Sequence, residues 1–263
     1  MIKQLIEDSR KIVIKIGSNT LSKDEGGIDK KVIQNISDQV YELIKKNKDI
    51  VIVSSGAGAC GIAAINKWAR KDDVHYKQAL CAIGQVELMN AYKEEFERFG
   101  IHIAQMLLTR DDFNDQNRIL NMRNTLFTLI DEKVLPIINE NDTVSTVEIK
   151  IGDNDTLAAL TATLWDADLL IMLSDIDGLY DKNPKDNGNA KFIDVVENVD
   201  TILDEVEIEG ISKFGTGGIL TKIEAAKRVN KYGIPMLLVN GKKEDIIIKL
   251  MAEEEKATLF KGK

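Results

Sequence analysis

The sequence is poor in the residues on which several common functions depend. Its 263 residues include two cysteines, Cys60 and Cys81, and two histidines, His75 and His102. The cysteines form no CxxC motif and no spacing typical of an extracellular disulfide framework, so both are expected to be reduced packing residues. Neither histidine adjoins a motif. This disfavours a Ser-His-Asp hydrolase and favours a chemistry that needs no general base.

Long apolar segments and an excess of positive charge are also missing. No stretch approaches the roughly 18 uncharged apolar residues of a membrane-spanning helix. Residues 1–17 lack the uninterrupted apolar core of a secretory signal. The 35 basic and 43 acidic side chains give a net charge of −8, which disfavours a broad basic surface for nucleic acid. We therefore expect a cytoplasmic protein that binds neither a membrane nor nucleic acid.

The sequence does contain a regular alternation of short apolar runs and helix-length amphipathic segments. The runs predict strands, and because they do not alternate with polar residues the strands should be covered on both faces: 11–17, 49–55, 101–108, 134–139, 168–174 and 234–240. The intervening segments predict helices: 29–47, 75–98, 116–131, 155–166 and 216–232. We expect an α/β fold, a three-layer αβα sandwich around a mainly parallel sheet, in a single domain over residues 1–263.

Two segments interrupt this alternation. Residues 181–190 are polar and contain Pro184 and Gly188, which predicts an exposed loop. Residues 204–222 are first acidic and then rich in glycine, a composition typical of a mobile cover near a ligand. Small polar residues and glycines also follow most predicted strands. Because ligands of parallel sheets bind beyond the carboxyl ends of the strands, we expect the ligand site at that edge.

The second predicted strand runs directly into Gly56-Ala-Gly58-Ala-Cys-Gly61, which matches the GxGxxG pattern of dinucleotide-binding folds. In those folds the pattern follows the first strand, and an acidic residue ends the next strand about 20 positions later. Here a strand and a helix precede the glycines, and a polar helical segment follows them. We interpret the match as accidental and expect a glycine turn that admits another ligand.

The segment GTGGILTK, residues 215–222, is not the GxxxxGK[ST] phosphate loop, because Leu220 occupies the position of the second glycine. Glycines, a hydroxyl group and Lys222 at the start of a predicted helix nevertheless suit a nucleotide phosphate, since free amides and the helix dipole attract anions. A flexible solvent loop is the alternative. Lys15, inside the first predicted strand, leaves a similar choice: a charge directed at a phosphate, or an edge lysine whose ammonium group reaches water.

Gly152-Asp153-Asn154-Asp155 opens another predicted helix. One Asp or Asn side chain suffices to cap a helix, so the second carboxylate suggests a further role such as holding lysines. Metal ligation is a further alternative, although neither a His/Cys cluster nor an EF-hand spacing accompanies these residues.

Nine segments, in order from about residue 10 to about residue 240, together match the pattern of one family. They are VIKIGSNTL, VIVSSGAGACG, KQALCAIGQVELMNAY, LLTRDDF, RNTLFTLI, PIINENDTV, IGDNDTLAAL, LLIMLSDIDGLYDKNP and GTGGILTKIEAAKR. The most specific feature is INEND followed by GDND and then SDIDGLYDKNP. On these segments the sequence resembles the glutamate 5-kinases of the amino acid kinase superfamily.

The resemblance implies the amino acid kinase fold. It also implies transfer of the ATP γ-phosphoryl group to the side-chain carboxylate of L-glutamate, which gives L-glutamyl 5-phosphate and begins proline biosynthesis. ATP is then the co-substrate and Mg²⁺ the cofactor, with no protein ligand of the metal assigned. The resemblance further implies a homo-oligomer, a dimer or tetramer, and feedback inhibition by proline. Many members carry a C-terminal PUA domain, which is not expected here because the sequence ends just after the kinase core.

The resemblance also implies roles for individual residues. The catalytic residues would be Lys15, Asp155 and Lys222, with the aspartate orienting the two lysines. The substrate would be bound by Ser55, Gly56, Asp142 and Asn154. ATP would be bound by Lys15, Gly17, Ser174, Asp175, Thr216, Gly217, Gly218, Ile219, Leu220, Thr221 and Lys222. The N-terminal part of the domain would mainly bind the substrate and the C-terminal part ATP.

Two other functions compete with this one. A sister kinase could act on N-acetylglutamate, aspartate, carbamate or a nucleoside monophosphate, but the INEND and GDND pair favours free glutamate. A catalytically silent amino acid or nucleotide sensor is disfavoured because Lys15, Asp155 and Lys222 are all present.

Overall fold

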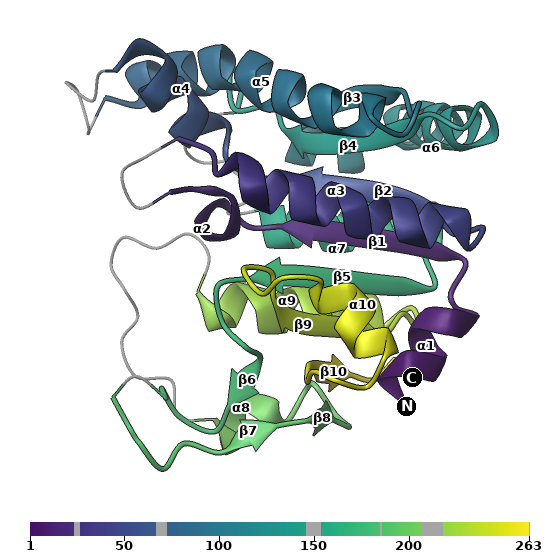
Figure 1. Cartoon of the computed structure of the whole chain (residues 1–263), viewed down its shortest axis with the longest axis vertical. Coiled ribbons are helices and arrows are strands. Elements are labelled where there is room, and N and C mark those ends of the chain that lie inside the picture. The colour runs from purple at the N-terminus through teal and green to yellow at the C-terminus, as the bar shows by residue number, and fades with distance from the viewer. Residues whose placement is uncertain (24–26, 67–72, 146–153, 185, 207–217, 263) are drawn as a thin grey trace.

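The computed structural model describes residues 1–23, 27–66, 73–145, 154–184, 186–206 and 218–262. Its centre is an eight-stranded sheet in the order β3-β4-β2-β1-β5-β9-β10-β8. From one edge to the other, the strands are β3 (Ile103–Leu108), β4 (Leu135–Glu140), β2 (Asp49–Ser54), β1 (Lys11–Ile16), β5 (Leu169–Ser174), β9 (Met236–Asn240), β10 (Thr258–Phe260) and β8 (Val195–Val196). Neighbouring strands are parallel except β9 and β10. The arrows of β1, β2 and β5 all point to the left in Figure 1.

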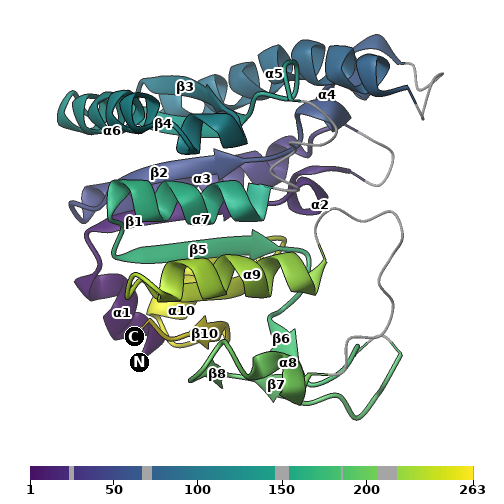
Figure 2. The same cartoon turned by 180° about the vertical axis from the view of Figure 1, so that it is seen from behind.

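Helices cover both faces of the sheet, so that the chain forms three layers (Figures 1 and 2). One face carries α1 (Ile2–Asp8), α3 (Lys30–Lys45), α5 (Val74–Glu97) and α10 (Ile246–Met251), with α4 (Ala57–Ile65) packed on α5. The opposite face carries α6 (Gln116–Asp131), α7 (Asn154–Trp165) and α9 (Ile219–Asn230). Within the described residues, no helix has both the length and the apolar character needed to cross a membrane.

The central strand β1 sends successive side chains to opposite layers. Ile12 and Ile14 are buried in the core cluster that includes residues of α3 and α5. Val13 lies in the second cluster, with residues of α7 and α9. Because both faces of the strand are covered, apolar residues follow one another without polar alternation. The period of two places Lys15 on the same face as Val13, toward α7.

The expected αβα sandwich is confirmed. Each predicted strand and helix has a counterpart among the described residues, with ends that differ by a few positions. The prediction that residues 101–108 are covered on both faces is wrong, because β3 is an edge strand in which Gln105 and Leu107 are exposed. Cys60 and Cys81 are free, as expected.

Several short elements were not predicted, because a few residues cannot display a period. They are α1, α4, α10, β8 and β10, together with α2 (Ser18–Leu21), α8 (Ile202–Glu205), the 3₁₀ turn Arg110–Phe113 and the hairpin of β6 (Leu179–Tyr180) and β7 (Phe192–Ile193). The predicted loop 181–190 joins β6 to β7 and consists of turns where it is described. Of the predicted cover 204–222, residues 207–217 lie outside the described residues.

Glycines allow α4 and α5 to approach closely. A Cβ atom on Gly84 of α5 would lie 1.8 Å from the carbonyl oxygen of Ala57 and 2.3 Å from the backbone nitrogen of Gly61. A Cβ atom on Gly61 of α4 would lie 1.9 Å from the carbonyl oxygen of Leu80. Backbone lies against backbone at both positions, so there is no flexible side chain that could move aside.

The three glycines of the GxGxxG pattern therefore differ in the structural reason for glycine at each position. Gly56 has a φ of 104°, a left-handed conformation that favours glycine. Gly61 is needed for the packing of α4 on α5. Gly58 is needed for neither, because a Cβ atom there would lie 3.5 Å from Cys81 Sγ, an ordinary contact. This difference supports the interpretation that the dinucleotide-like spacing is accidental.

Replacing Gly84 by alanine should destabilise the protein by about 2 kcal/mol or more, because the new methyl group forces α4 and α5 apart. Urea unfolding at equilibrium measures the effect. Gly58→Ala on the facing helix is the matched control and should be neutral or slightly stabilising. Equal stability of the two variants would contradict the close approach of the helices.

Candidate active site

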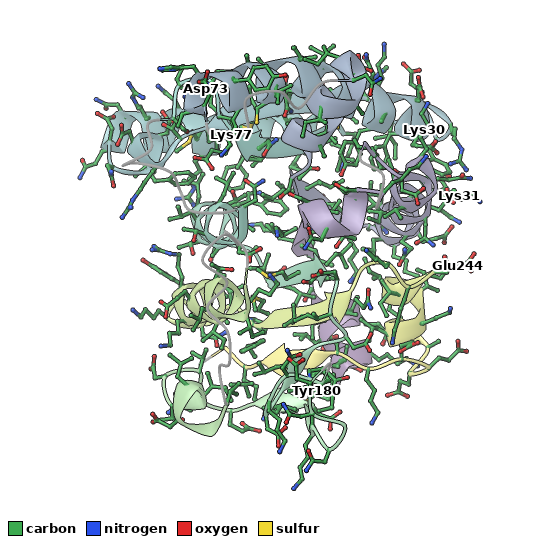
Figure 3. The ribbon with its side chains drawn as sticks, turned by 90° about the vertical axis from the view of Figure 1, so that its left-hand side faces the viewer. Lys30, Lys31, Asp73, Lys77, Tyr180 and Glu244 are labelled. Atoms are coloured by element: carbon green, nitrogen blue, oxygen red, sulfur yellow. The ribbon has the colours of Figure 1, made fainter. Side chains whose placement is uncertain are left out.

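The polar residues that follow the strands meet at one edge of the sheet. β2 ends at Ser54, β4 at Glu140 and β5 at Ser174, and these strands are parallel to one another through β1. Figure 3 looks onto this edge, with Asp73 and Tyr180 at opposite sides of it. The structure therefore gathers the residues that the sequence placed after different strands.

The most deeply buried charges of this edge form one cluster. The Asp155 carboxylate is fully buried and pairs through Oδ1 with the ammonium group of Lys15. Its other oxygen, Oδ2, lies 3.1 Å from Lys222 Nζ and accepts a hydrogen bond of 2.8 Å from the Thr221 hydroxyl. Lys15 and Lys222 are themselves only 6% and 5% exposed. One carboxylate thus holds two buried lysines side by side.

Three elements supply this cluster. Lys15 lies on β1 and faces the layer of α7 and α9, Asp155 lies in the first turn of α7, and Lys222 lies in the first turn of α9. The alternative that Lys15 is an edge lysine is wrong, because β1 pairs with β2 on one side and β5 on the other. A lysine at that position is tolerable only because a carboxylate meets it.

The two ammonium groups of the cluster keep its carboxylate ionised. Burial alone would raise the pKa of the Asp155 carboxyl, but the nearby ammonium groups of Lys15 and Lys222 outweigh it and hold the pKa below its ordinary value. The carboxylate therefore stays ionised at neutral pH and pairs with both ammonium groups. The Asp175 carboxylate also interacts with Lys222, which contributes to lowering the pKa of Asp175. The amino end of α9 adds the positive end of its helix dipole beside Lys222.

A second cluster, which carries no formal charge, lies at the ends of β2 and β4. Asn154 Nδ2 donates hydrogen bonds to the Ser55 hydroxyl at 2.8 Å, to the Ser54 carbonyl at 3.1 Å and to Asn139 Oδ1 at 3.0 Å. Ser54, Ser55 and Asn139 are buried. Since Asn154 and Asp155 are adjacent at the start of α7, this amide cluster adjoins the lysine cluster.

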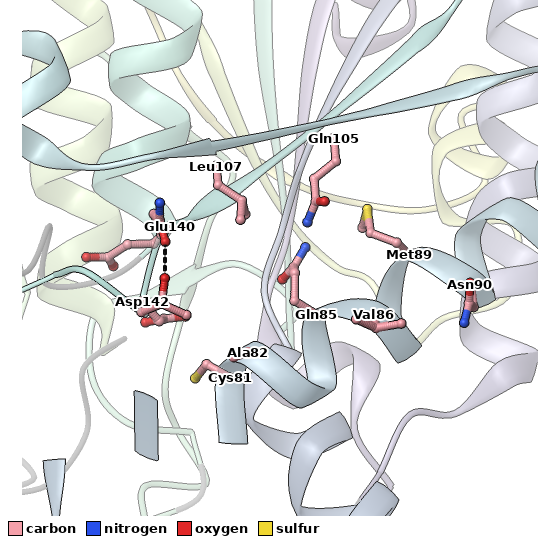
Figure 4. A pocket seen from close by; sticks show the side chains of 12 residues that line it. Cys81, Ala82, Gln85, Val86, Met89, Asn90, Gln105, Leu107, Glu140 and Asp142 are labelled. Carbon is pink, nitrogen blue, oxygen red and sulfur yellow. Dashed lines mark hydrogen bonds between the residues drawn. The ribbon is translucent and has the colours of Figure 1, made fainter. Parts of the chain in front are cut away.

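The other residues expected to bind the substrate lie nearby. Gly56 follows Ser55 and precedes α4. Asp142 lies just after β4 and lines a pocket together with Glu140 and with residues of α5 and β3 (Figure 4). Asn139 was not among the predicted site residues, although it is the first asparagine of the INEND motif. Its position between Ser54, Ser55 and Asn154 could not be derived from the motif alone.

Among the residues expected to bind ATP, Gly17 follows β1, and Ser174 and Asp175 lie at the end of β5. A Cβ atom on Gly17 would lie 3.4 Å from Lys15 Nζ, so glycine leaves room beside that ammonium group. Ser174 ends β5, and its hydroxyl donates to Asp175 at 3.3 Å. Partial burial would raise the pKa of Asp175, but hydrogen bonds from Asn19 and Ser174 contribute to lowering it.

The glycine-rich segment is described only from Gly218 onward. Gly218 immediately precedes α9, and a Cβ atom on it would meet nothing within 4 Å among the described residues. Its carbonyl accepts a hydrogen bond of 2.8 Å from the Thr221 hydroxyl. The first turn of α9 then contains Ile219, Leu220, Thr221 and Lys222. Thr216 and Gly217 lie outside the described residues.

Comparisons with known proteins identify the family of the chain. A model of the amino acid kinase family matches residues 10–240. The glutamate 5-kinase of Alkaliphilus metalliredigens is 62% identical over 262 residues, covering 100% of this chain and 99% of the relative. The glutamate 5-kinase of Syntrophotalea carbinolica is 45% identical over 260 residues, covering 99% of this chain and 69% of the relative.

Solved structures share the fold at much lower identity. UMP kinase from Ureaplasma parvum superposes with a TM-score of 0.65 at 19% identity, covering 96% of this chain and 98% of that one. Carbamate kinase from Giardia lamblia bound to AMP-PNP gives a TM-score of 0.67 at 16% identity, covering 98% and 100%. From the family model and the relatives together, we conclude that the chain belongs to the amino acid kinase family and, within it, to the glutamate 5-kinases.

Proposed function

We propose that the protein transfers the γ-phosphoryl group of ATP to the side-chain carboxylate of L-glutamate. The product is L-glutamyl 5-phosphate, and the reaction is the first step of proline biosynthesis. The observation that carries the proposal is the buried cluster of Lys15, Asp155 and Lys222, which places two ammonium groups where parallel strands end. The 62% identity to a glutamate 5-kinase over the whole chain supports the choice of substrate.

The reaction needs positioning and charge stabilisation rather than proton transfer. The glutamate side chain is ionised at neutral pH, so one of its oxygens can attack the γ-phosphorus without a base. A bond forms between this oxygen and phosphorus while the bond from phosphorus to the β,γ-bridging oxygen breaks, and ADP leaves with that electron pair. Lys15 and Lys222 stabilise the charge on the transferred group, and Asp155 holds the two ammonium groups in place.

The amide cluster and its neighbours are proposed to bind glutamate. Asp142 offers a carboxylate to the substrate's ammonium group, while Ser55 and Asn154 supply hydrogen bonds. Gly56 lets the backbone approach the substrate closely. This arrangement assigns glutamate mainly to the N-terminal part of one amino acid kinase domain and ATP mainly to the C-terminal part.

ATP is proposed to lie beyond β5 and the start of α9. The proposed contacts are Lys15, Gly17, Ser174, Asp175 and the segment from Thr216 to Lys222, of which Thr216 and Gly217 are outside the described residues. The space beside Gly218 and the amino end of α9 suit phosphate oxygens.

Mg²⁺ is proposed to accompany the nucleotide and, when bound, to neutralise part of the phosphate charge. Within the described part of the chain, no group of three or more His, Cys, Asp or Glu side chains could hold a metal ion. A cytoplasmic location, a homo-oligomer and inhibition by proline remain predictions.

Acyl phosphate formation, trapped as a hydroxamate with hydroxylamine, tests the proposed reaction. L-Glutamate with ATP should give a strong signal, and N-acetylglutamate and aspartate should not. In Lys222→Ala, kcat should fall by about a hundredfold or more, because one of the two cations on the transferred group is lost.

Lys227→Ala is the matched control on the same helix, since Lys227 forms an ion pair with Glu224 outside the cluster. It should retain the activity of the parent protein. A signal with another acid alone would overturn the proposed substrate, and equal losses in both variants would overturn the assignment of Lys222.

Asp155→Asn should lower both activity and stability. It leaves two buried ammonium groups without their shared counter-charge, which costs about 3 kcal/mol or more of unfolding free energy. Because the folded-state pKa of Asp155 is lowered, its contribution is present above the ordinary aspartate pKa and is lost as the pH falls through the folded-state value. The stability gap to the parent should therefore persist at mildly acidic pH and close only well below about pH 4.

Urea unfolding at several pH values, together with kcat, measures these effects. Asp166→Asn is the control, because Asp166 is exposed just beyond the other end of α7 and has a left-handed conformation that asparagine also tolerates. A stability gap that stays constant into strongly acidic solution would contradict the assigned charge interaction.

A further inference from the structure

We propose that Gln85 of α5 is a positioning residue for glutamate binding: by accepting a hydrogen bond from Asn139, it reinforces the amide orientation that backbone groups set in Asn139 and Asn154. The inference rests on the proposed function and deepens it, since it names what makes the substrate pocket directional. Gln85 is 9% exposed, and its Oε1 accepts a hydrogen bond of 2.8 Å from Asn139 Nδ2. Asn139 Oδ1 in turn accepts the hydrogen bond of 3.0 Å from Asn154 Nδ2.

Gln85, Asn139 and Asn154 form a relay of hydrogen-bonded amides. Two backbone groups determine which atom of Asn139 and of Asn154 is the oxygen and which is the nitrogen. The Ser54 carbonyl can only accept, so the atom of Asn154 that faces it at 3.1 Å must be the amide nitrogen. The Glu140 N–H can only donate, so the atom of Asn139 that faces it at 2.8 Å must be the amide oxygen. Asn139 Nδ2 is therefore directed at Gln85, which must present an oxygen.

The relay decides which atom Asn154 offers to a ligand. With Nδ2 engaged by Ser54, Ser55 and Asn139, the remaining Asn154 Oδ1 is buried and has no hydrogen-bond partner among the described residues. An acceptor in that state suits a donor on the ligand, and the ammonium group of glutamate is such a donor. If the Asn139 amide turned over, its nitrogen would face Asn154 Nδ2 and the Glu140 N–H, donor against donor.

Gln85 is well placed to hold this orientation. It follows Gly84, at which α5 packs directly against the backbone of α4. Its side chain lines the pocket that Asp142 also lines, as Figure 4 shows. Its Nε2 has no hydrogen-bond partner among the described residues, so the Oε1 contact with Asn139 is its one hydrogen bond there. The oxygen of Gln85, rather than its NH₂ group, is therefore the functional atom.

Three variants of the full chain test the relay. Gln85→Met keeps the length of the side chain but removes the oxygen. It should raise KM for L-glutamate, and the Kd measured by calorimetry, by about tenfold, because Asn139 Nδ2 is left buried without an acceptor. KM for ATP and kcat should stay within about twofold of the parent values, since the lysine cluster is untouched. Gln85→Glu keeps an acceptor oxygen in either protonation state and should bring KM for glutamate back to within about threefold.

Gln39→Met is the matched control for a purely structural effect. Gln39 of α3 is 1% exposed, and its Oε1 accepts a hydrogen bond of 2.7 Å from the backbone N–H of Ile247, away from the site. This variant should lose stability without a change in KM for glutamate. In an Asn139→Ala background, Gln85→Met should have little further effect, because the two residues act in series.

The outcomes separate this inference from the proposed function. A parent protein that forms no acyl phosphate from L-glutamate would overturn both. An active parent would overturn the role of Gln85 alone in any of four cases. These are a Gln85→Met variant with unchanged KM for glutamate, an equal rise in both KM values, failure of Gln85→Glu to restore binding, and multiplicative effects with Asn139→Ala.

Discussion

The site depends on one buried carboxylate. Asp155 meets Lys15 from the central strand and Lys222 from α9, and all three side chains are almost inaccessible to water. Two ammonium groups could not be buried together without it, because their mutual repulsion and desolvation would be unopposed. With it, the two ammonium groups are held side by side in their charged form. The same interaction ties β1, α7 and α9 together at the edge where the strands end.

The sheet makes this interaction geometrically available. Side chains alternate along β1, so Lys15 lies on the α7 side while its neighbours Ile14 and Ile16 fill the opposite core. The parallel connection then starts α7 and α9 at the carboxyl edge, where their amino ends and first-turn residues meet the lysine. Lys15 thus interrupts the apolar run that follows Lys11 in β1.

Much of this arrangement could be predicted from the sequence. Different features of the sequence predicted different parts of it, and some contacts could not be predicted at all. The spacing of apolar residues was sufficient to predict the three layers, because strands made of continuous apolar runs must be covered by helices on both faces. It failed at β3, since the exposure of Gln105 and Leu107 depends on strand order, which local pattern does not encode. The grouping of Lys15 with Lys222 came from family resemblance. The contact of Gln85 with Asn139 depends on which amide atom faces which, and no sequence pattern records that.

The two halves of the site differ in how they discriminate. The lysine cluster acts through charge, which varies gradually with distance and direction, and it therefore suits a phosphoryl group whose charge shifts during transfer. The amide cluster has no charge to offer and acts through the direction of hydrogen bonds, which distinguish donor from acceptor. Such a site is selective only if its amides are held in one orientation. An amide that is free to turn over can present either its oxygen or its NH₂ group to the ligand. In Asn154 that freedom is removed by the Ser54 carbonyl on one side and by Asn139, held by Gln85, on the other.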